Sequence, residues 1–280
     1  MLLMAVIAGW PAQTPSAISD QTEIEPRQAL PSQMLIVQTQ NVESVIDHLL
    51  AHQVPTIDQL PIIDAVVAAD REGLRTSLLE LDTVKFVVGN RGIRATGIKS
   101  LGKVMTNDSD YPASINAKLL DAEGYLAAGV KIAMIDSGLK AHKVLLRNTS
   151  NQNRLLAFHD VLDGVGYPID GYGHGTHLAA IAVSIQSTVN GGYKGIAPEA
   201  DLVVVRAFDE TGKGAYLSAL QTLNWVFDHH QSLDIRVLNL SFSVPAQSFY
   251  WDDPVNRTLM KLWDAGVWLL LRREIAVLSR

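Results

Sequence analysis

Two short stretches of the sequence carry side chains suited to acid–base chemistry. Asp136 ends the apolar run VKIAMID and is followed by Ser137 and Gly138. His174 lies in GYGHGTHL, with a glycine on each side. A buried carboxylate that accepts one ring N–H of a histidine fixes its tautomer, and the other ring nitrogen can then take a proton from a nucleophile. The sequence therefore predicts that His174 is a general base oriented by Asp136.

A zinc site is the alternative interpretation of the histidine stretch. His174 and His177 could share one face of a helix and bind a metal ion. Helical zinc sites usually place the two histidines four residues apart with a glutamate between them, as in H-E-x-x-H. Here the spacing is three residues without a glutamate, and only Asp160, Asp163 and Asp170 offer a third ligand. We therefore expect no metal and a structural role for His177.

The surrounding elements predict an α/β fold with a doubly wound parallel sheet. Apolar runs typical of buried parallel strands alternate with helical patterns from about residue 112 onward. The strands are expected at 130–136, 201–208, 235–242 and 267–271, and the helices at 177–187, 215–230 and 255–266. Ligands of such sheets bind beyond the carboxyl ends of the strands, where Asp136 lies.

Residues 33–90 show a separate, smaller alternation. It predicts an α+β domain of the ferredoxin-like kind, with helices on one face of a short sheet. The strands are expected at 33–40, 62–69 and 84–89, and the helices at 41–53 and 71–84. Residues 91–111 lose this periodicity, gain Gly, Ser, Asn and Asp, and are predicted to be a linker to a domain over 112–280.

Composition narrows the function classes. The chain has no cysteine, which excludes disulfides and thiolate metal sites. Its net charge is −6 and no long basic run occurs, which argues against a nucleic-acid partner. Residues 1–32 begin with an apolar run resembling a signal peptide without its positive n-region, and no stretch reaches the roughly 18–20 apolar residues of a membrane span. We expect a secreted or periplasmic protein with no membrane partner.

The two stretches together resemble the motifs of the subtilisin-like serine proteases (subtilases, peptidase S8 family). The letters DSG at 136–138 resemble the D-S/T-G motif of that family, and HGTHLA at 174–179 resembles its H-G-T-H-V-A motif. Aspartate also precedes histidine in subtilisin. The resemblance covers about 112–267 and implies a subtilisin-like fold and endopeptidase activity on protein or peptide substrates. It assigns orientation of the base to Asp136 and the base to His174.

The resemblance extends to two segments that would bind the substrate backbone. Residues 193–220 resemble the family's GVAP segment with its substrate loop, and 237–243 resemble the strand that ends in S-L/Y/F-G. The substrate-binding residues implied are Gly212, Lys213, Gly214, Ser241, Phe242 and Ser243. Ser243 replaces the usual glycine and adds a side chain where the substrate would pass. Both segments suit capture of a peptide as an added β-strand.

Residues 33–90 resemble, by pattern and position, the propeptide domain that precedes many subtilases as a folding aid and inhibitor. The resemblance therefore implies the chain's own propeptide domain as a partner of its catalytic domain. We expect no cofactor. Calcium binding is compatible with the family resemblance, but no residue of this sequence can be assigned to a calcium site.

Two parts of subtilase chemistry have no match in the sequence. The family takes an oxyanion donor from a G-N turn after the strand corresponding to 266–271, and its serine from a G-T-S-x-A/S motif roughly 150 residues after the histidine. After Val267 this sequence reads WLLLRREIAVLSR, and no later serine has that context. We expect a catalytic domain truncated before the nucleophile and negligible peptidase activity.

A non-catalytic function is the alternative hypothesis. The 33–90 domain, or the peptide groove, would then bind a protease or a peptide without cleaving it, as a propeptide-type inhibitor does. A translated fragment without function is the third hypothesis.

Overall fold

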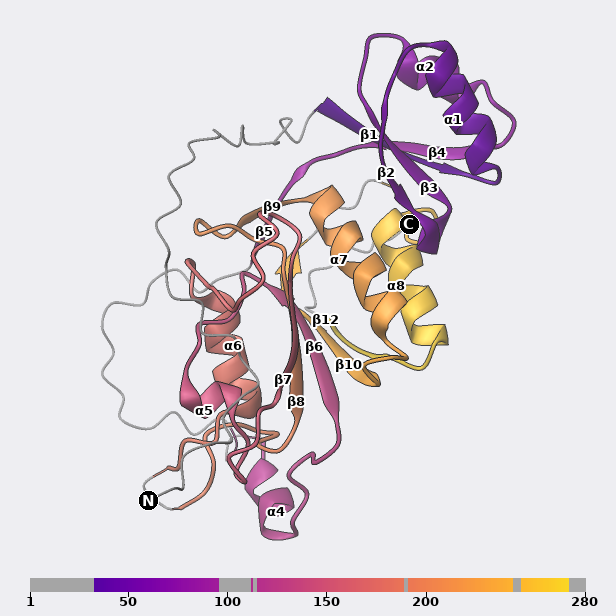
Figure 1. Cartoon of the computed structure of the whole chain (residues 1–280). Helices are drawn as coiled ribbons and strands as arrows, with labels where there is room; N and C mark the ends of the chain where they lie inside the picture. The colour runs from indigo at the N-terminus through magenta and orange to yellow at the C-terminus, as the bar shows by residue number, and fades with distance from the viewer. Residues whose placement is uncertain (1–32, 96–111, 113–114, 189–190, 244–247, 272–280) are drawn as a thin grey trace, which may run out of the picture.

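A computed structural model describes residues 33–95, 112, 115–188, 191–243 and 248–271, which form two units of helices and strands (Figure 1). The leader expected at 1–32 and most of the expected linker lie outside these residues. Within the described ranges, no helix combines the length and the apolar character that crossing a membrane requires.

The first unit is a four-stranded antiparallel sheet with two helices. Its elements are β1 (Met34–Thr39), α1 (Val42–Ala51), β2 (Thr56–Leu60), β3 (Ala65–Ala69), α2 (Leu74–Leu79) and β4 (Val84–Gly89). The strand order β2-β3-β1-β4 is that of a ferredoxin-like fold. Strand β2 was not predicted, because TIDQL alternates between exposed and partly buried residues and has only two large apolar side chains.

One face of this small sheet carries both helices. Helix α1 begins at Asn41, whose side chain accepts a hydrogen bond from Ser44 N and so satisfies a backbone donor of the first turn. Val45 and Leu49 of α1 pack with Leu35 and other apolar side chains of the sheet. Full burial of each such side chain stabilises the fold by about 1.5–3 kcal/mol.

The second unit contains a five-stranded parallel sheet, which confirms the doubly wound fold class. Its strands, in the order β12-β10-β6-β8-β7, all run parallel. The strands are β6 (Lys131–Asp136), β7 (Leu155–Asp160), β8 (Asp201–Arg206), β10 (Ile235–Leu240) and β12 (Trp268–Leu271). Strand β7 was not predicted, because most of its side chains are only partly buried at the sheet edge and its apolar run is short.

Helices cover both faces of this sheet, as Figure 1 shows. Helices α5 (Lys143–Leu146) and α6 (His174–Val183) lie on one face, and α7 (Tyr216–His229) and α8 (Pro254–Asp264) lie on the other, while α4 (Ala117–Ala122) precedes β6. Met134 packs on the α6 side, whereas Ala133 and Ile135 pack on the side of α7 and α8. Burial on both faces explains the continuous apolar runs of β6 and β8, whereas the apolar run of β12 is mostly exposed.

A third sheet joins segments that are far apart in the sequence. Strand β5 (Gly92–Ala95) pairs antiparallel with β9 (Lys213–Ala215) on one side and with β11 (Phe242–Ser243) on the other. Residues 92–95, which were expected in a linker, form a strand. Short-range patterns missed β5 because both of its partner strands lie more than 100 residues further along the chain.

A stack of three rings connects the edge strand β7 to α7. The His159 ring stacks on Trp225 with centroids 4.8 Å apart, and Trp225 stacks on His229 at 4.2 Å. Burial lowers the pKa of His159 from its ordinary value, the positive charge of His229 lowers it further, and Asp160 opposes both effects.

We expect the His159 stack to lose stability in mild acid. Because the pKa of His159 is lower in the folded state, the unfolded chain binds the proton first as the pH falls below about 6.5, and the free energy of unfolding decreases. Melting temperatures measured at about pH 7.5 and about pH 5.5 should differ less for His159→Gln than for the wild type. The exposed His177→Gln is the control, and an equal loss of pH dependence in both variants would contradict the expectation.

Candidate active site

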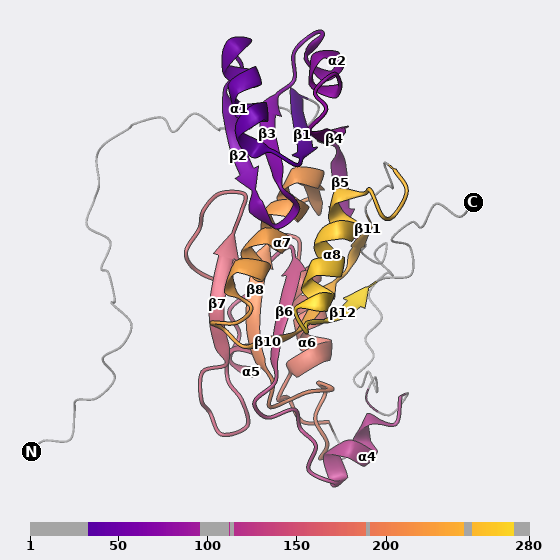
Figure 2. The same ribbon diagram turned by 90° about the vertical axis from the view of Figure 1, so that its right-hand side faces the viewer.

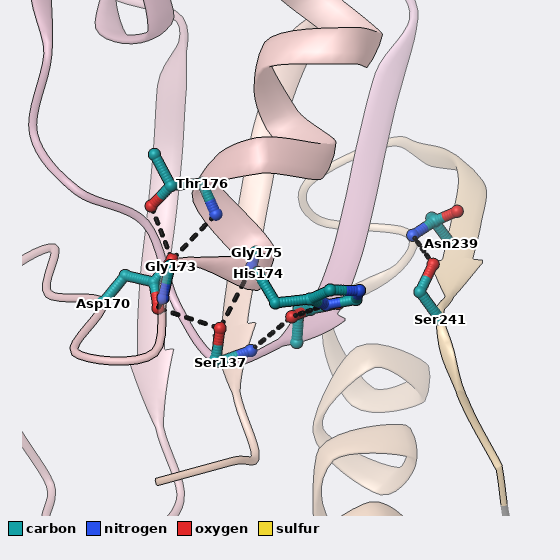
Figure 3. Close-up of polar contacts among 9 residues, drawn as sticks. Ser137, Asp170, Gly173, His174, Gly175, Thr176, Asn239 and Ser241 are labelled. Atoms are coloured by element: carbon teal, nitrogen blue, oxygen red, sulfur yellow. Dashed lines mark hydrogen bonds and ion pairs between the residues drawn. The ribbon is translucent and has the colours of Figure 1, made fainter. Parts of the chain in front are cut away.

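Asp136 and His174 meet at the carboxyl end of the central strand. Asp136 is the last residue of β6 and its side chain is 1% exposed, while His174 is the first residue of α6. His174 Nδ1 lies 2.7 Å from Asp136 Oδ1, and Ser137 N donates to the same oxygen at 2.7 Å (Figure 3). An ionised carboxylate can only accept, so the proton of this bond resides on Nδ1. The pairing that the sequence predicts is present in the structure.

The second carboxylate oxygen of Asp136 has a different environment. Oδ2 is buried, and no hydrogen-bond donor among the described residues reaches it. A buried negative charge that is only partly satisfied carries a desolvation cost, which a positive charge beside it reduces. The imidazole of His174, which is hydrogen-bonded to Oδ1, lies beside this carboxylate.

Two glycines allow the helix and the strand end to come this close. A Cβ on Gly175 would lie 2.2 Å from Gly138 O and 3.2 Å from Asp136 Cβ. Gly138 has a φ of 118°, and a Cβ there would lie 1.9 Å from Ile169 O. The glycines in the two motifs are thus required by contact between backbones.

Asp170 caps the helix that carries His174. The N-cap residue Gly173 has no side chain to accept the first amides of α6. Instead Asp170 Oδ1 accepts from Gly173 N at 2.7 Å, and Oδ2 accepts from Thr176 N at 2.8 Å and from Thr176 Oγ1 at 2.5 Å. A carboxylate at this end of a helix also interacts favourably with the helix dipole.

The histidines of the stretch do not converge on one point. His177 is exposed on α6, and the ring of His174 meets Asp136 rather than a second imidazole. Within the described part of the chain, no three His, Cys, Asp or Glu side chains are grouped so that they could hold a metal ion.

The six residues proposed to bind substrate lie around β5. Ala95 N donates to Gly212 O at 2.9 Å, and the register pairs Ile93 with Gly214 and Arg94 with Lys213. On the other side, Phe242 pairs with Ala95 and Ser243 pairs with Arg94. Ser241 precedes β11, and its Oγ accepts from Asn239 Nδ2 at 3.0 Å. Figure 3 shows the His174 ring pointing away from Asp170, toward the side where Asn239 and Ser241 lie.

The loop before β9 is shaped by one carboxylate. Asp209 Oδ1 accepts from Thr211 N and Thr211 Oγ1, both at 2.8 Å, and from Lys213 N at 2.9 Å. These bonds lower the pKa of Asp209 although its partial burial acts in the opposite direction. The loop is therefore held in the shape that presents Gly212 O to β5.

A comparison of sequences identifies the family. Residues 127–267, just over half of the chain, match the sequence model of the Subtilase family (Peptidase_S8). This chain belongs to the subtilase family. The matched range contains Asp136, His174 and both strands that flank β5.

Several named proteases are similar to this subtilase. It is 28% identical over 144 residues to serine protease AprX of Bacillus subtilis (strain 168), and this match covers 50% of this chain and 31% of AprX. It is 30% identical over 134 residues to subtilisin DY of Bacillus licheniformis, and this match covers 48% of this chain and 44% of subtilisin DY. The chain thus spans about a third to a half of the length of these relatives.

A solved structure shares the fold of this subtilase. The crystal structure of fervidolysin from Fervidobacterium pennivorans, described as a keratinolytic enzyme related to subtilisin, superposes with a TM-score of 0.60. The superposition covers 85% of this chain and 39% of that chain, at 15% sequence identity. At this identity the comparison establishes the subtilisin-like fold alone.

Sequence reasoning missed the polar groups that support the pair in this subtilase. It weighed Asp170 only as a zinc ligand, and it gave Ser137 no role beyond the motif. Asp170 lies four residues before His174 and three before Gly173, and a carboxylate just ahead of a helix that lacks a capping side chain is the signal that could have revealed it.

We expect Gly175→Ala to destabilise the fold, because the new methyl group would overlap Gly138 O. Overpacking of this kind typically costs about 1–3 kcal/mol in the free energy of unfolding, measured by urea denaturation. Gly166→Ala is the matched control, since that exposed position has open space around it and should change stability by less than about 0.5 kcal/mol. Equal stability of the two variants would contradict the close contact.

Proposed function

We propose that this subtilase carries the acid–base pair and the peptide-binding strands of a serine endopeptidase. The observation that carries the proposal is the 2.7 Å hydrogen bond from His174 Nδ1 to Asp136 Oδ1 at the end of β6. Asp136 fixes the imidazole with its proton on Nδ1, so that Nε2 is the nitrogen that accepts a proton from the nucleophile. The negative charge of Asp136 then stabilises the imidazolium that forms.

The proposed substrate site is the slot between β9 and β11. Strand β5 indicates how a peptide would bind, because it pairs with both neighbours through backbone hydrogen bonds. Its side chains alternate: Ile93 and Ala95 are 3% and 7% exposed, whereas Gly92 and Arg94 are exposed. A substrate strand in the same place would gain affinity from its main chain and selectivity from its alternate side chains.

The first unit would act as a propeptide that blocks this slot in cis. Its β2 packs against α7, and η2 (Pro61–Ile63) packs against both α7 and α8. Figure 2 shows the first unit next to these two helices. Polar contacts join the units. Gln221 Nε2 donates to Asp58 Oδ2 at 2.6 Å, and Ile62 N donates to Asn224 Oδ1 at 3.2 Å. Leu217 N donates to Asn90 Oδ1 at 2.9 Å, and Arg257 Nη1 donates to Gln38 Oε1 at 3.4 Å. Because β5 follows β4 directly, docking of the first unit delivers β5 to the slot.

Hydrolysis further requires a nucleophile and an oxyanion donor. The 280 residues contain no serine in the G-T-S context and no G-N turn after β12. Loss of one oxyanion donor lowers turnover by about 10²–10³, and in subtilisin loss of the serine lowers it by about 10⁶. We therefore propose that this chain by itself has negligible peptidase activity.

Joining the chain to a segment that supplies both parts tests the acid–base role. We expect a fusion to a subtilase C-terminal segment that carries the G-N turn and the G-T-S serine to hydrolyse casein once the first unit has been removed, and the unjoined chain to show no hydrolysis. His174→Ala in the fusion should lower the rate by a factor on the order of 10⁶, as seen for subtilisin. His177→Ala is the control and should retain the rate, while an active His174→Ala fusion would overturn the proposal.

The filled slot also favours a second function, binding of a peptide without cleavage. Strand β5 already occupies the place of a ligand, as expected of a propeptide-type inhibitor. This function needs the two flanking strands and the first unit, but neither His174 nor a nucleophile.

Opening the slot distinguishes binding from cleavage. Ile93→Asp would place a carboxylate in an apolar site at a cost of several kcal/mol, so we expect β5 to leave and the Ala95 amide to exchange rapidly with solvent. A fluorescein-labelled GIRA peptide should then bind the variant but not the wild type. Arg94→Asp, at an exposed position of the same strand, should keep the slot filled. Mass spectrometry of the bound peptide separates capture from hydrolysis, and absence of binding to Ile93→Asp would contradict the slot.

A further inference from the structure

Ser137 links the aspartate of the pair to the residue after the histidine. Its backbone N donates to Asp136 Oδ1 at 2.7 Å. Its hydroxyl accepts from Gly175 N at 3.0 Å and donates to Asp170 Oδ1 at 2.8 Å (Figure 3). A movement of Ser137 would therefore disturb two bonds: the one from Ser137 N to Asp136, and the one from Gly175 N, next to His174, to Ser137 Oγ.

Asp170 holds the backbone on both sides of His174. Gly173 and Thr176, which precede and follow the histidine, both donate to its carboxylate. With Ser137 Oγ and Thr176 Oγ1, Asp170 accepts four hydrogen bonds, two on each oxygen. A carboxylate can accept all four, whereas the amide of asparagine offers one oxygen and a donating NH₂ group.

We propose that Asp170 is a positioning residue that sets the distance and tautomer of the Asp136–His174 pair through Ser137 and the first turn of α6. The inference rests on the proposed role of His174 as a base. Asp170 does not need to touch the substrate in this role. The tautomer of a histidine follows from the bond that its other ring nitrogen makes, so a small shift of α6 away from β6 weakens the preference for the Nδ1 proton.

A second buried carboxylate in the same sheet provides a control that distinguishes positioning of the pair from general stabilisation of the fold. Asp160, at the end of β7, is buried, accepts from Leu162 N at 3.0 Å and from Val165 N at 3.4 Å, and pairs with Arg206 at 2.7 Å. Among the described residues, these bonds of Asp160 do not reach Ser137, Asp136 or His174. Asp160→Asn therefore removes a similar charge from the same sheet edge without touching the pair.

Histidine ¹⁵N NMR of the full 280-residue chain above neutral pH tests the proposal. In the wild type we expect His174 to carry its proton on Nδ1, with a slowly exchanging Nδ1–H signal. In Asp170→Asn we expect that signal to be lost and the Nδ1-protonated fraction to fall by at least about twofold, since one pair of acceptor sites is replaced by a donor. Asp160→Asn should keep the wild-type signal even where its melting temperature falls as far.

Ser137 supplies an independent test should Asp170→Asn fail to fold. Ser137→Ala removes the hydroxyl link and should reproduce the loss of the Nδ1–H signal, while Ser137→Thr keeps the hydroxyl and should retain it. The proposal is overturned if Asp170→Asn and Ser137→Ala both keep the wild-type tautomer, or if Asp160→Asn changes it equally. No peptidase activity enters this measurement, so an inactive fusion would count against the proposed function and leave the positioning role standing.

Discussion

The hydrogen bond between Asp136 and His174 sets the main constraint on the second unit. It joins the last residue of β6 to the first residue of α6, and it forms only if the strand end and the helix start touch. A parallel doubly wound sheet provides that meeting point, because the segments leaving the strands all emerge at the same edge. The sheet order puts β6 at the centre, between β10 and β8, and Asp136 at its end is buried.

The close contact between the end of β6 and the start of α6 explains why the DSG and HGTHLA motifs contain glycine. Gly138 and Gly175 are present because backbone atoms of the opposite segment fill the space that a side chain would need. The resulting helix start has no capping side chain of its own, and Asp170 takes that role from the preceding turn. The Asp170 carboxylate thus satisfies backbone amides at the start of α6 and, as we propose, also fixes the geometry of the Asp136–His174 pair.

The proposed peptide slot depends on a different physical principle. Strands β9 and β11 are short, and each leaves backbone groups that a third strand can satisfy. Strand β5 fills this position and buries Ile93 and Ala95 with the apolar core that also holds Phe208, Tyr216 and Phe242. Tyr216 N in turn donates to Arg91 O at 2.7 Å, which ties the start of β5 to α7. One short strand therefore connects the first unit to the part of the second unit that would bind substrate.

The sequence by itself determined the fold class, the buried strands β6 and β8, and which aspartate and histidine to expect as partners, because these features leave local signals. Continuous apolar runs mark buried parallel strands, and glycine-rich turns around single polar residues mark the edge where they end. Only the tertiary structure decided which segments that are distant in the sequence contact one another. It revealed β2 and β7, whose partial burial gives no clear periodicity, and β5, whose partners are distant in sequence. It also revealed the bonds from Ser137 and Asp170, because a hydrogen bond between two loops depends on where the sheet and α6 bring them and leaves no periodic trace in the chain.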